Sequence, residues 1–109
     1  MPSEIAADDL AARLRDGKPV LLIDVREDWE REVCRLPGDV HVPLRDLPGR
    51  VAGLAVPAGA QVVVYCHAGV RSWMAAGYLE QAHGWRDVAS LAGGIDAWSV
   101  LVDPSVQRY

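Results

Sequence analysis

Short apolar runs and amphipathic stretches alternate along this chain of 109 residues. Apolar runs bounded by turn residues are typical of buried strands, and apolar positions spaced three and four apart are typical of helices. We expect strands around residue 5 and over residues 19–25, 40–44, 62–65 and 88–91. We expect helices over residues 7–15, 27–34, 46–54 and 72–83, and a glycine turn at 92–94 that leads into residues 95–98.

Strands and helices therefore alternate, and the segments between them are short. This order predicts an α/β fold in which a parallel sheet is covered by helices on both faces. No internal repeat, low-complexity tract or long linker divides the chain, so we expect residues 1–109 to form a single domain. The polar tail over residues 103–109 is expected to lie on the surface.

The most informative stretch runs from the valine-rich strand at 62–65 into the next helix. The strand stops at Cys66, a short loop with Gly69 follows, and Arg71 stands at the start of the helix. The N–H groups of such a loop and a helix N-terminus bind anions and favour thiolate over thiol. Cysteine is also often no more than a small buried hydrophobe, so at this point catalysis and packing remain equal alternatives.

Two charged residues follow the strand at 19–25. In open α/β sheets, sites collect at the carboxyl ends of the strands, and Asp24 and Arg26 fall at such an end. We interpret them as a structural ion pair that supports the strand end and the cysteine loop, rather than as groups that react with substrate.

Composition narrows the classes of function. The net charge is -4, which argues against a general nucleic-acid-binding face. The N-terminus has no apolar signal core, and no apolar run approaches the roughly 20 residues of a membrane span. We therefore expect a cytoplasmic protein with no nucleic-acid or membrane partner. Cys34 and Cys66 fit no metal-ligand spacing, so we expect no metal, and a reducing compartment would leave Cys66 free to react.

Four stretches resemble, in the same order, the signature sequences of rhodanese-like sulfurtransferases: residues 23–27, 36–44, 66–72 and 91–98. The resemblance implies a three-layer α/β/α sandwich around a five-stranded, mostly parallel sheet, and no cofactor. It implies that Cys66 is the catalytic nucleophile and carries a transferable sulfur as a persulfide. The residues expected to bind substrate are those of the loop: His67, Ala68, Gly69, Val70, Arg71 and Ser72.

The reaction implied by this resemblance is sulfur transfer. The Cys66 thiolate would attack the outer sulfur of a donor such as thiosulfate, and cyanide, a thiol or an activated acyl group would then accept that sulfur. We expect Arg71 to hold the oxyanion and Ser72 to cap the helix. His67 is expected to shape the rim of the site rather than to act as a base, because adjacent side chains in a tight loop diverge.

Partners are suggested by a finer resemblance. Residues 33–38 and 102–109 are similar to rhodanese-like domains fused behind E1-like adenylyltransferases, which activate ubiquitin-like sulfur carriers. That similarity adds a cysteine desulfurase and a ubiquitin-like sulfur-carrier protein to thiosulfate as candidate partners. Cys34 is interpreted as a packing residue rather than a resolving thiol, and Trp73 as one wall of the pocket.

Two alternatives to sulfur transfer stay open. Cysteine-dependent phosphatases of related fold have a C-x5-R loop, whereas Cys66 and Arg71 form the shorter C-x4-R, which suits a single sulfur better than a phosphate. The second alternative is a rhodanese fold that serves only as a protein-binding module. The presence of both Cys66 and Arg71 argues against it.

Overall fold

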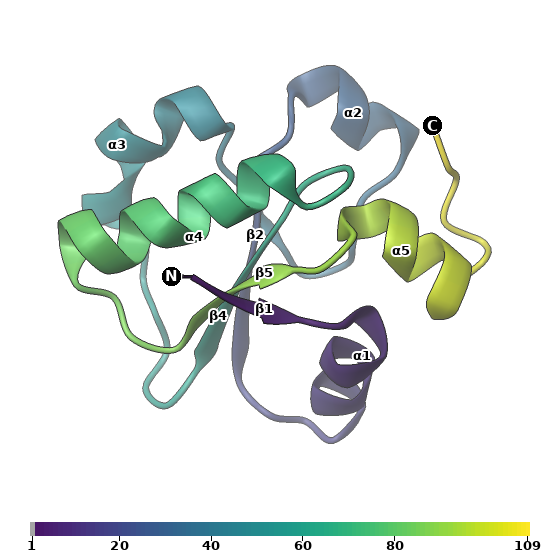
Figure 1. Cartoon of the computed structure of the whole chain (residues 1–109), viewed down its shortest axis with the longest axis horizontal. Coiled ribbons are helices and arrows are strands. Elements are labelled where there is room, and N and C mark those ends of the chain that lie inside the picture. The colour runs from purple at the N-terminus through teal and green to yellow at the C-terminus, as the bar shows by residue number, and fades with distance from the viewer. Residues whose placement is uncertain (1) are drawn as a thin grey trace.

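The computed structural model describes residues 2–109 and is built around one sheet (Figure 1). The strands are β1 (Ser3–Ile5), β2 (Val20–Asp24), β3 (Val40–His41), β4 (Gln61–Tyr65) and β5 (Val88–Leu91). The helices are α1 (Ala7–Arg15), α2 (Asp28–Val33), α3 (Leu47–Arg50), α4 (Val70–His83) and α5 (Gly94–Leu101). Two short 3₁₀ turns, Leu44–Asp46 and Val51–Gly53, flank α3.

The sheet has the strand order β1-β5-β4-β2-β3, and each neighbouring pair runs parallel. The predicted five-stranded α/β fold is therefore confirmed. β4 lies at the centre, between β2 and β5, so its carboxyl end is surrounded by those of its neighbours. A site at the end of β4 is thus enclosed by loops from both sides of the sheet.

Side chains of β4 alternate between two apolar cores, as the two-residue period of a strand requires. Val62, Val64 and Cys66 point into the core formed with α3 and α4. Val63 and Tyr65 point into the core formed with α1 and α5. Figure 1 shows these helix pairs on opposite sides of the sheet, which gives the three layers.

Several predicted elements differ in their bounds from those observed, and three of the differences have a clear position in the chain. β3 has two residues rather than five, because Pro43 has no N–H for the sheet and a 3₁₀ turn begins at once. The predicted helix over 46–54 is broken into α3 and two 3₁₀ turns, and its Pro48, Gly49 and Gly53 explain why. α4 begins two residues earlier than predicted, at Val70.

The polar composition of the C-terminal tail predicts that it lies on the surface. The structure differs from this prediction at two side chains. Val106 and Tyr109 are partly buried and pack against the core beneath α1 and α5. Ser99 in α5 donates a hydrogen bond to the Val106 carbonyl (2.6 Å), and Arg108 pairs with Asp96 (2.8 Å). The packing of Val106 and Tyr109, together with these two bonds to α5, folds the tail back along that helix.

Candidate active site

Cys66 is placed directly after the central strand, at the bottom of the loop that leads into α4. Only 1 % of its surface is exposed. Gly69 N–H donates to Cys66 Sγ at 3.1 Å, and Ser72 N–H donates to the same atom at 3.4 Å. The loop therefore surrounds the sulfur with N–H donors at a helix N-terminus, which stabilises negative charge on a thiolate or on a bound sulfur.

Gly69 makes this geometry possible because its φ is 105°, a conformation that suits glycine. A Cβ at Gly69 would also stand 3.2 Å from the backbone nitrogen of Gly93. Gly69 occupies the N-cap position of α4, without a side-chain cap. Ser72 lies in the first turn instead, so the prediction that Ser72 caps this helix is wrong.

The Ser72 hydroxyl is buried beside the cysteine. Its Oγ lies 3.4 Å from Cys66 Sγ and 2.8 Å from Ser90 Oγ in β5. A hydroxyl can donate one hydrogen bond while it accepts another. With Cys66 ionised, Ser90 can donate to Ser72 and Ser72 to the sulfur, which adds a side-chain donor to the two N–H groups.

The start of α5 holds the cysteine loop from behind. Ile95 N–H donates to the Cys66 carbonyl (2.9 Å), and Asp96 N–H donates to the His67 carbonyl (3.1 Å). Gly94 lies so close that a Cβ there would stand 2.5 Å from the Cys66 carbonyl oxygen and collide with that of His67. The 91–98 stretch therefore acts through backbone contact with the loop.

Arg71 is held by a buried carboxylate. Its two terminal nitrogens donate to Glu30 Oε1 and Oε2 at 2.6 and 2.9 Å, and Glu30 lies in α2. These bonds raise the pKa of Arg71. The Arg71 side chain stays 33 % exposed, and two of its five N–H donors face Glu30. The pair thus fixes the guanidinium and leaves donors for an anion.

Glu30 remains ionised in spite of its burial. Burial alone would raise the pKa of this carboxyl, but hydrogen bonds from Arg71 and Tyr109 outweigh it and lower the pKa to about 2. Glu30 also accepts the N–H of Glu27 (3.0 Å) at the start of α2. Glu30 lies in the first turn of α2, and the N-terminus of a helix stabilises a negative charge.

Asp24 and Arg26 form a fully buried, two-bonded ion pair, with both N···O distances at 2.9 Å. Arg26 also donates to the carbonyls of Glu30 (3.3 Å) and Cys34 (2.7 Å). Among its contacts with the described residues, none reaches the cysteine loop directly. Arg26 instead holds the end of α2, and α2 holds Arg71 through Glu30.

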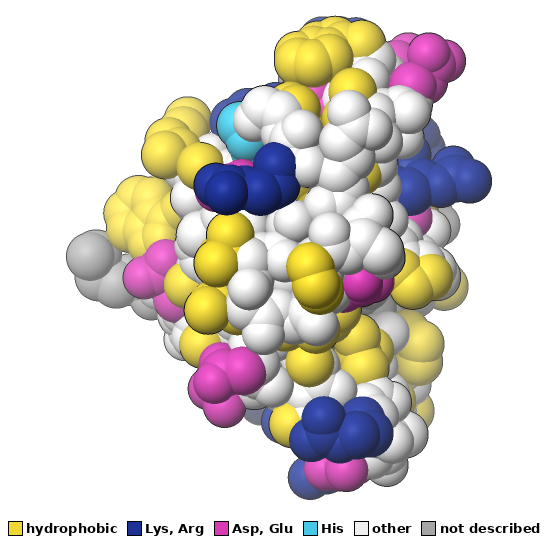
Figure 2. Space-filling view, turned by 90° about the vertical axis from the view of Figure 1, so that its right-hand side faces the viewer, with side chains coloured by type: hydrophobic (Ala, Val, Ile, Leu, Met, Phe, Trp, Pro, Cys, Tyr) yellow, Lys and Arg dark blue, Asp and Glu magenta, His cyan; other side chains and the backbone are white. Residues whose placement is uncertain are grey.

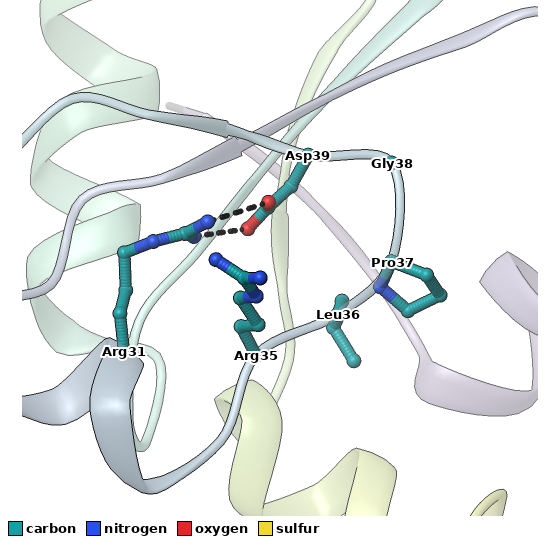
Figure 3. Close-up of a pocket in the computed structure, with 6 residues that line it drawn as sticks. All are labelled: Arg31, Arg35, Leu36, Pro37, Gly38 and Asp39. Atoms are coloured by element: carbon teal, nitrogen blue, oxygen red, sulfur yellow. Dashed lines mark hydrogen bonds and ion pairs between the residues drawn. The ribbon is translucent and has the colours of Figure 1, made fainter.

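Arg31, which lies in α2, extends this network on the other side of Asp24. Arg31 bridges Asp24 (2.9 Å) and Asp39 (2.6 Å), and Tyr65 donates its hydroxyl to Asp39 (2.6 Å). Figure 3 shows the Arg31–Asp39 pair with Arg35 beside it. These residues line an open hollow with a volume of about 470 Å³. This hollow is lined by residues 31 and 35–39 and does not contain Cys66.

The other predicted site residues lie in the loop or directly after it. The His67 ring stacks on Tyr109, with centroids 4.1 Å apart, and its role at the rim of the site stays a prediction. Ala68 precedes α4, and Val70, the first residue of that helix, is 70 % exposed. Trp73 follows in α4 and is 38 % exposed, so its role as a pocket wall stays a prediction.

Cys34 is a free thiol, like Cys66, and is partly buried against the core beneath α1 and α5. Arg26 Nη1 lies 3.8 Å from its sulfur. This environment is that of a packing residue.

Four residues near the loop were missed by the sequence reasoning: Glu30, Ser90, Gly94 and Tyr109. Ser90 carries a signal, since it is a polar residue inside an otherwise apolar strand. Gly94 lies in the predicted glycine turn and in the 91–98 signature, but neither pattern predicts its close approach to the loop. Glu30 and Tyr109 carry no signal of their own, because only the fold brings them beside residues 67 and 71.

Three further observations concern the surface, metal sites and membrane spans. On the face shown in Figure 2, charged side chains lie in separate small groups between apolar and uncharged atoms. Within residues 2–109, no three His, Cys, Asp or Glu side chains are grouped so that they could bind a metal ion. No helix in that range combines the length and apolarity needed to cross a bilayer.

Comparison with known proteins decides the family. The profile of the rhodanese-like domain family matches residues 6–101. The chain belongs to the rhodanese-like family. A crystal structure of a rhodanese-like domain protein from Staphylococcus aureus is similar over 98 % of both chains, with a TM-score of 0.80 and 29 % identity. A thiosulfate sulfurtransferase from Pseudomonas aeruginosa has a TM-score of 0.81 and 29 % identity over 91 % of this chain and 19 % of that one.

The rhodanese-like relatives fall into two size classes. A protein named sulfurtransferase from Allochromatium vinosum is 37 % identical over 91 % of this chain and 90 % of its own length. The probable adenylyltransferase/sulfurtransferase MoeZ of Mycobacterium tuberculosis is 34 % identical over 98 % of this chain. This chain spans only 27 % of MoeZ, so the match concerns one part of that protein.

Proposed function

We propose that this chain is a sulfurtransferase in which Cys66 is the nucleophile and carries sulfane sulfur as a persulfide. The observation that carries the proposal is the convergence of the Gly69 and Ser72 N–H groups on Cys66 Sγ. Sulfurtransferase is also the printed name of the Allochromatium relative. We further propose that residues 1–109 form one rhodanese-like domain that works in the cytoplasm.

The proposed loading step conserves charge. The Cys66 thiolate attacks the outer sulfur of thiosulfate, the bond between the two donor sulfurs breaks, and sulfite leaves with the electron pair. Cys66 then carries S–S⁻. With a protein persulfide as donor, the same attack releases the donor's thiolate. In the second half-reaction, a nucleophilic acceptor attacks the outer sulfur and Cys66 departs as thiolate.

The loop suits this chemistry because negative charge stays near its N–H donors at each stage. Before loading the charge is on Cys66 Sγ, and afterwards it is on the outer sulfur. Arg71, fixed by Glu30, is the group we assign to the oxyanion of a sulfonate donor. Asp24 and Arg26 contribute indirectly, because they hold α2 in place and α2 carries Glu30.

The donor and acceptor are proposed from the two classes of relatives. Thiosulfate is the donor suggested by the Pseudomonas structure, and cyanide or a thiol would accept the sulfur in a minimal reaction. MoeZ joins adenylyltransferase and sulfurtransferase in its name, which favours a ubiquitin-like sulfur carrier as acceptor and a cysteine desulfurase as donor. A phosphatase remains less favoured, because the C-x4-R loop is one residue shorter than the phosphatase loop.

A thiol substitution at Cys66 tests the proposal. We expect Cys66→Ser to abolish sulfur transfer from thiosulfate to cyanide, measured as thiocyanate formation, because a serine hydroxyl cannot carry a persulfide. Cys34→Ser is the matched control and should retain transfer. Activity that survives in Cys66→Ser would place the nucleophile elsewhere, and its loss in Cys34→Ser would point to Cys34.

A further inference from the structure

The tail beyond α5 brings Tyr109 to the cysteine loop. Figure 1 shows this tail running from α5 toward α2, and the Tyr109 side chain contacts residues of α2 and of the loop. The tail is anchored by the Ser99–Val106 hydrogen bond and by the Arg108–Asp96 pair. Its last side chain therefore has a defined position.

The Tyr109 ring covers one side of the loop. It stacks on the His67 ring at 4.1 Å with an interplanar angle of 15°, and it meets the Trp29 ring edge-on at 5.8 Å. His67 directly follows the nucleophile, and Trp29 directly precedes Glu30. Tyr109 thus joins the loop to α2 through two aromatic contacts.

The Tyr109 hydroxyl reaches the other side of the site. It donates to Glu30 Oε2 at 2.6 Å and accepts from Arg26 Nη1 at 3.0 Å. Glu30 is the carboxylate that holds Arg71. One tyrosine therefore contacts both a rim residue of the loop and the group that orients the arginine of the loop.

We propose that Tyr109 is a positioning residue for sulfur transfer, an inference that rests on the proposed function. Its ring keeps His67 turned to the rim, and its hydroxyl keeps Glu30 aligned with Arg71. No bond to Tyr109 forms or breaks during transfer. Without the hydroxyl, Glu30 loses one of its two side-chain donors, and the guanidinium that should receive the anionic donor is less well fixed.

Two variants separate the ring from the hydroxyl. Tyr109→Phe retains the stacking on His67 and removes the bonds to Glu30 and Arg26, whereas Tyr109→Leu removes both features. We expect Tyr109→Phe to lower kcat/KM for persulfide formation from thiosulfate by about threefold to tenfold, mainly through a higher KM. Tyr109→Leu should lose about tenfold or more. Only Tyr109→Leu should shift the imidazole proton resonances of His67.

Tyr78→Phe is the matched control, because within residues 2–109 it removes a hydroxyl that bonds to His83 in α4 (3.0 Å) and to no residue of the site. It should match wild type in KM and kcat. If Tyr109 only stabilised the fold, its substitution would lower Tm and the fraction of active protein. The apparent kcat would then fall, and the KM for thiosulfate would stay unchanged. If Tyr109→Leu does not fold, Tyr109→Phe decides.

The outcomes separate this inference from the proposed function. A wild-type chain that takes up no sulfur overturns the proposed function and the role of Tyr109 with it. A competent wild type whose Tyr109→Phe variant has an unchanged KM for thiosulfate overturns the inference alone. A higher KM in Tyr109→Phe, with Tyr78→Phe unchanged, supports it.

Discussion

At the scale of single residues, the site separates the group that reacts from the groups that hold charge. Cys66 receives hydrogen bonds from the backbone, and these donors survive almost any change of side chain in the loop. Arg71, in contrast, depends on Glu30 for its orientation. Side-chain substitutions should therefore affect donor preference more readily than the basic capacity of Cys66 to hold a sulfur.

Arg71→Ala tests this separation. Thiosulfate carries a sulfonate that needs a positive partner, and a protein persulfide does not. Hydrogen bonds to charged groups contribute about 1.5–3 kcal/mol, so we expect kcat/KM for thiosulfate to fall about tenfold to a hundredfold. The loss with a persulfide-loaded protein donor should be smaller.

The two donors are compared on the same Arg71→Ala preparation, so any loss of folded protein affects both rates equally. Such a loss is expected, because the substitution leaves Glu30 buried without its arginine. Arg86→Ala, at an exposed position after α4, controls for the change in net charge. Equal losses with both donors would remove Arg71 from the oxyanion role.

At the scale of elements, the cysteine loop lies between the starts of two helices. α4 directs N–H groups toward the sulfur, and α5 directs N–H groups toward the carbonyls behind it. The loop is therefore fixed by backbone atoms on both sides. Close approach at Gly94 is the condition for this arrangement, because a side chain there would displace residues 66 and 67.

Gly94→Ala should destabilise the protein and disturb the site, and Gly84→Ala is a matched control. The two glycines have nearly the same φ, 62° and 65°, but a Cβ at Gly84 meets nothing within 4 Å. Gly84→Ala should lose about 1 kcal/mol of unfolding free energy from backbone strain alone. Gly94→Ala should lose at least about 2 kcal/mol more, with sulfur transfer reduced about tenfold.

Chemical denaturation of the two glycine variants measures the difference. Equal stability losses in Gly94→Ala and Gly84→Ala would mean that the loop can move away from residue 94 without a further loss of unfolding free energy. The contact between α5 and the loop would then not be what holds the cysteine.

At the scale of the whole molecule, a buried network links β2, α2, the loop and the tail. It contains three cations, Arg26, Arg31 and Arg71, and three carboxylates, Asp24, Glu30 and Asp39. The charges balance, which is what allows so many ionised groups to lie in and beside the core. Protonation of one carboxylate leaves an unpaired cation, so the network makes stability depend on pH.

Glu30 gives that dependence a sign and a range. Its pKa is about 2 in the folded protein against an ordinary 4.5, so its contribution is complete above pH 4.5 and is lost as pH falls toward 2. We expect wild type to exceed Glu30→Gln in unfolding free energy by roughly 2–3 kcal/mol near neutral pH. The difference should shrink across this acidic range, as measured by denaturation at a series of pH values. Parallel pH profiles would contradict this role of Glu30.

The order of elements and the position of the nucleophile could be predicted because both depend on local sequence. The valine run, Cys66 and Gly69 lie in one short stretch of sequence. Glycine and proline residues stand at most boundaries between helices and strands. The partners of Arg71 and His67 could not be predicted, because Glu30 and Tyr109 lie 41 and 42 residues away along the chain. The polar composition of the tail predicts a surface position and gives no sign that Val106 and Tyr109 pack against the core.

The central claim is that Cys66 carries one transferable sulfur atom. Intact-protein mass spectrometry after incubation with thiosulfate, and separately with a persulfide-loaded cysteine desulfurase, tests it most directly. We predict a gain of one sulfur atom that maps to Cys66, disappears on addition of cyanide or a thiol, and is absent in Cys66→Ser. A wild-type mass that stays unchanged with every donor, or a sulfur adduct that persists in Cys66→Ser, would contradict the account.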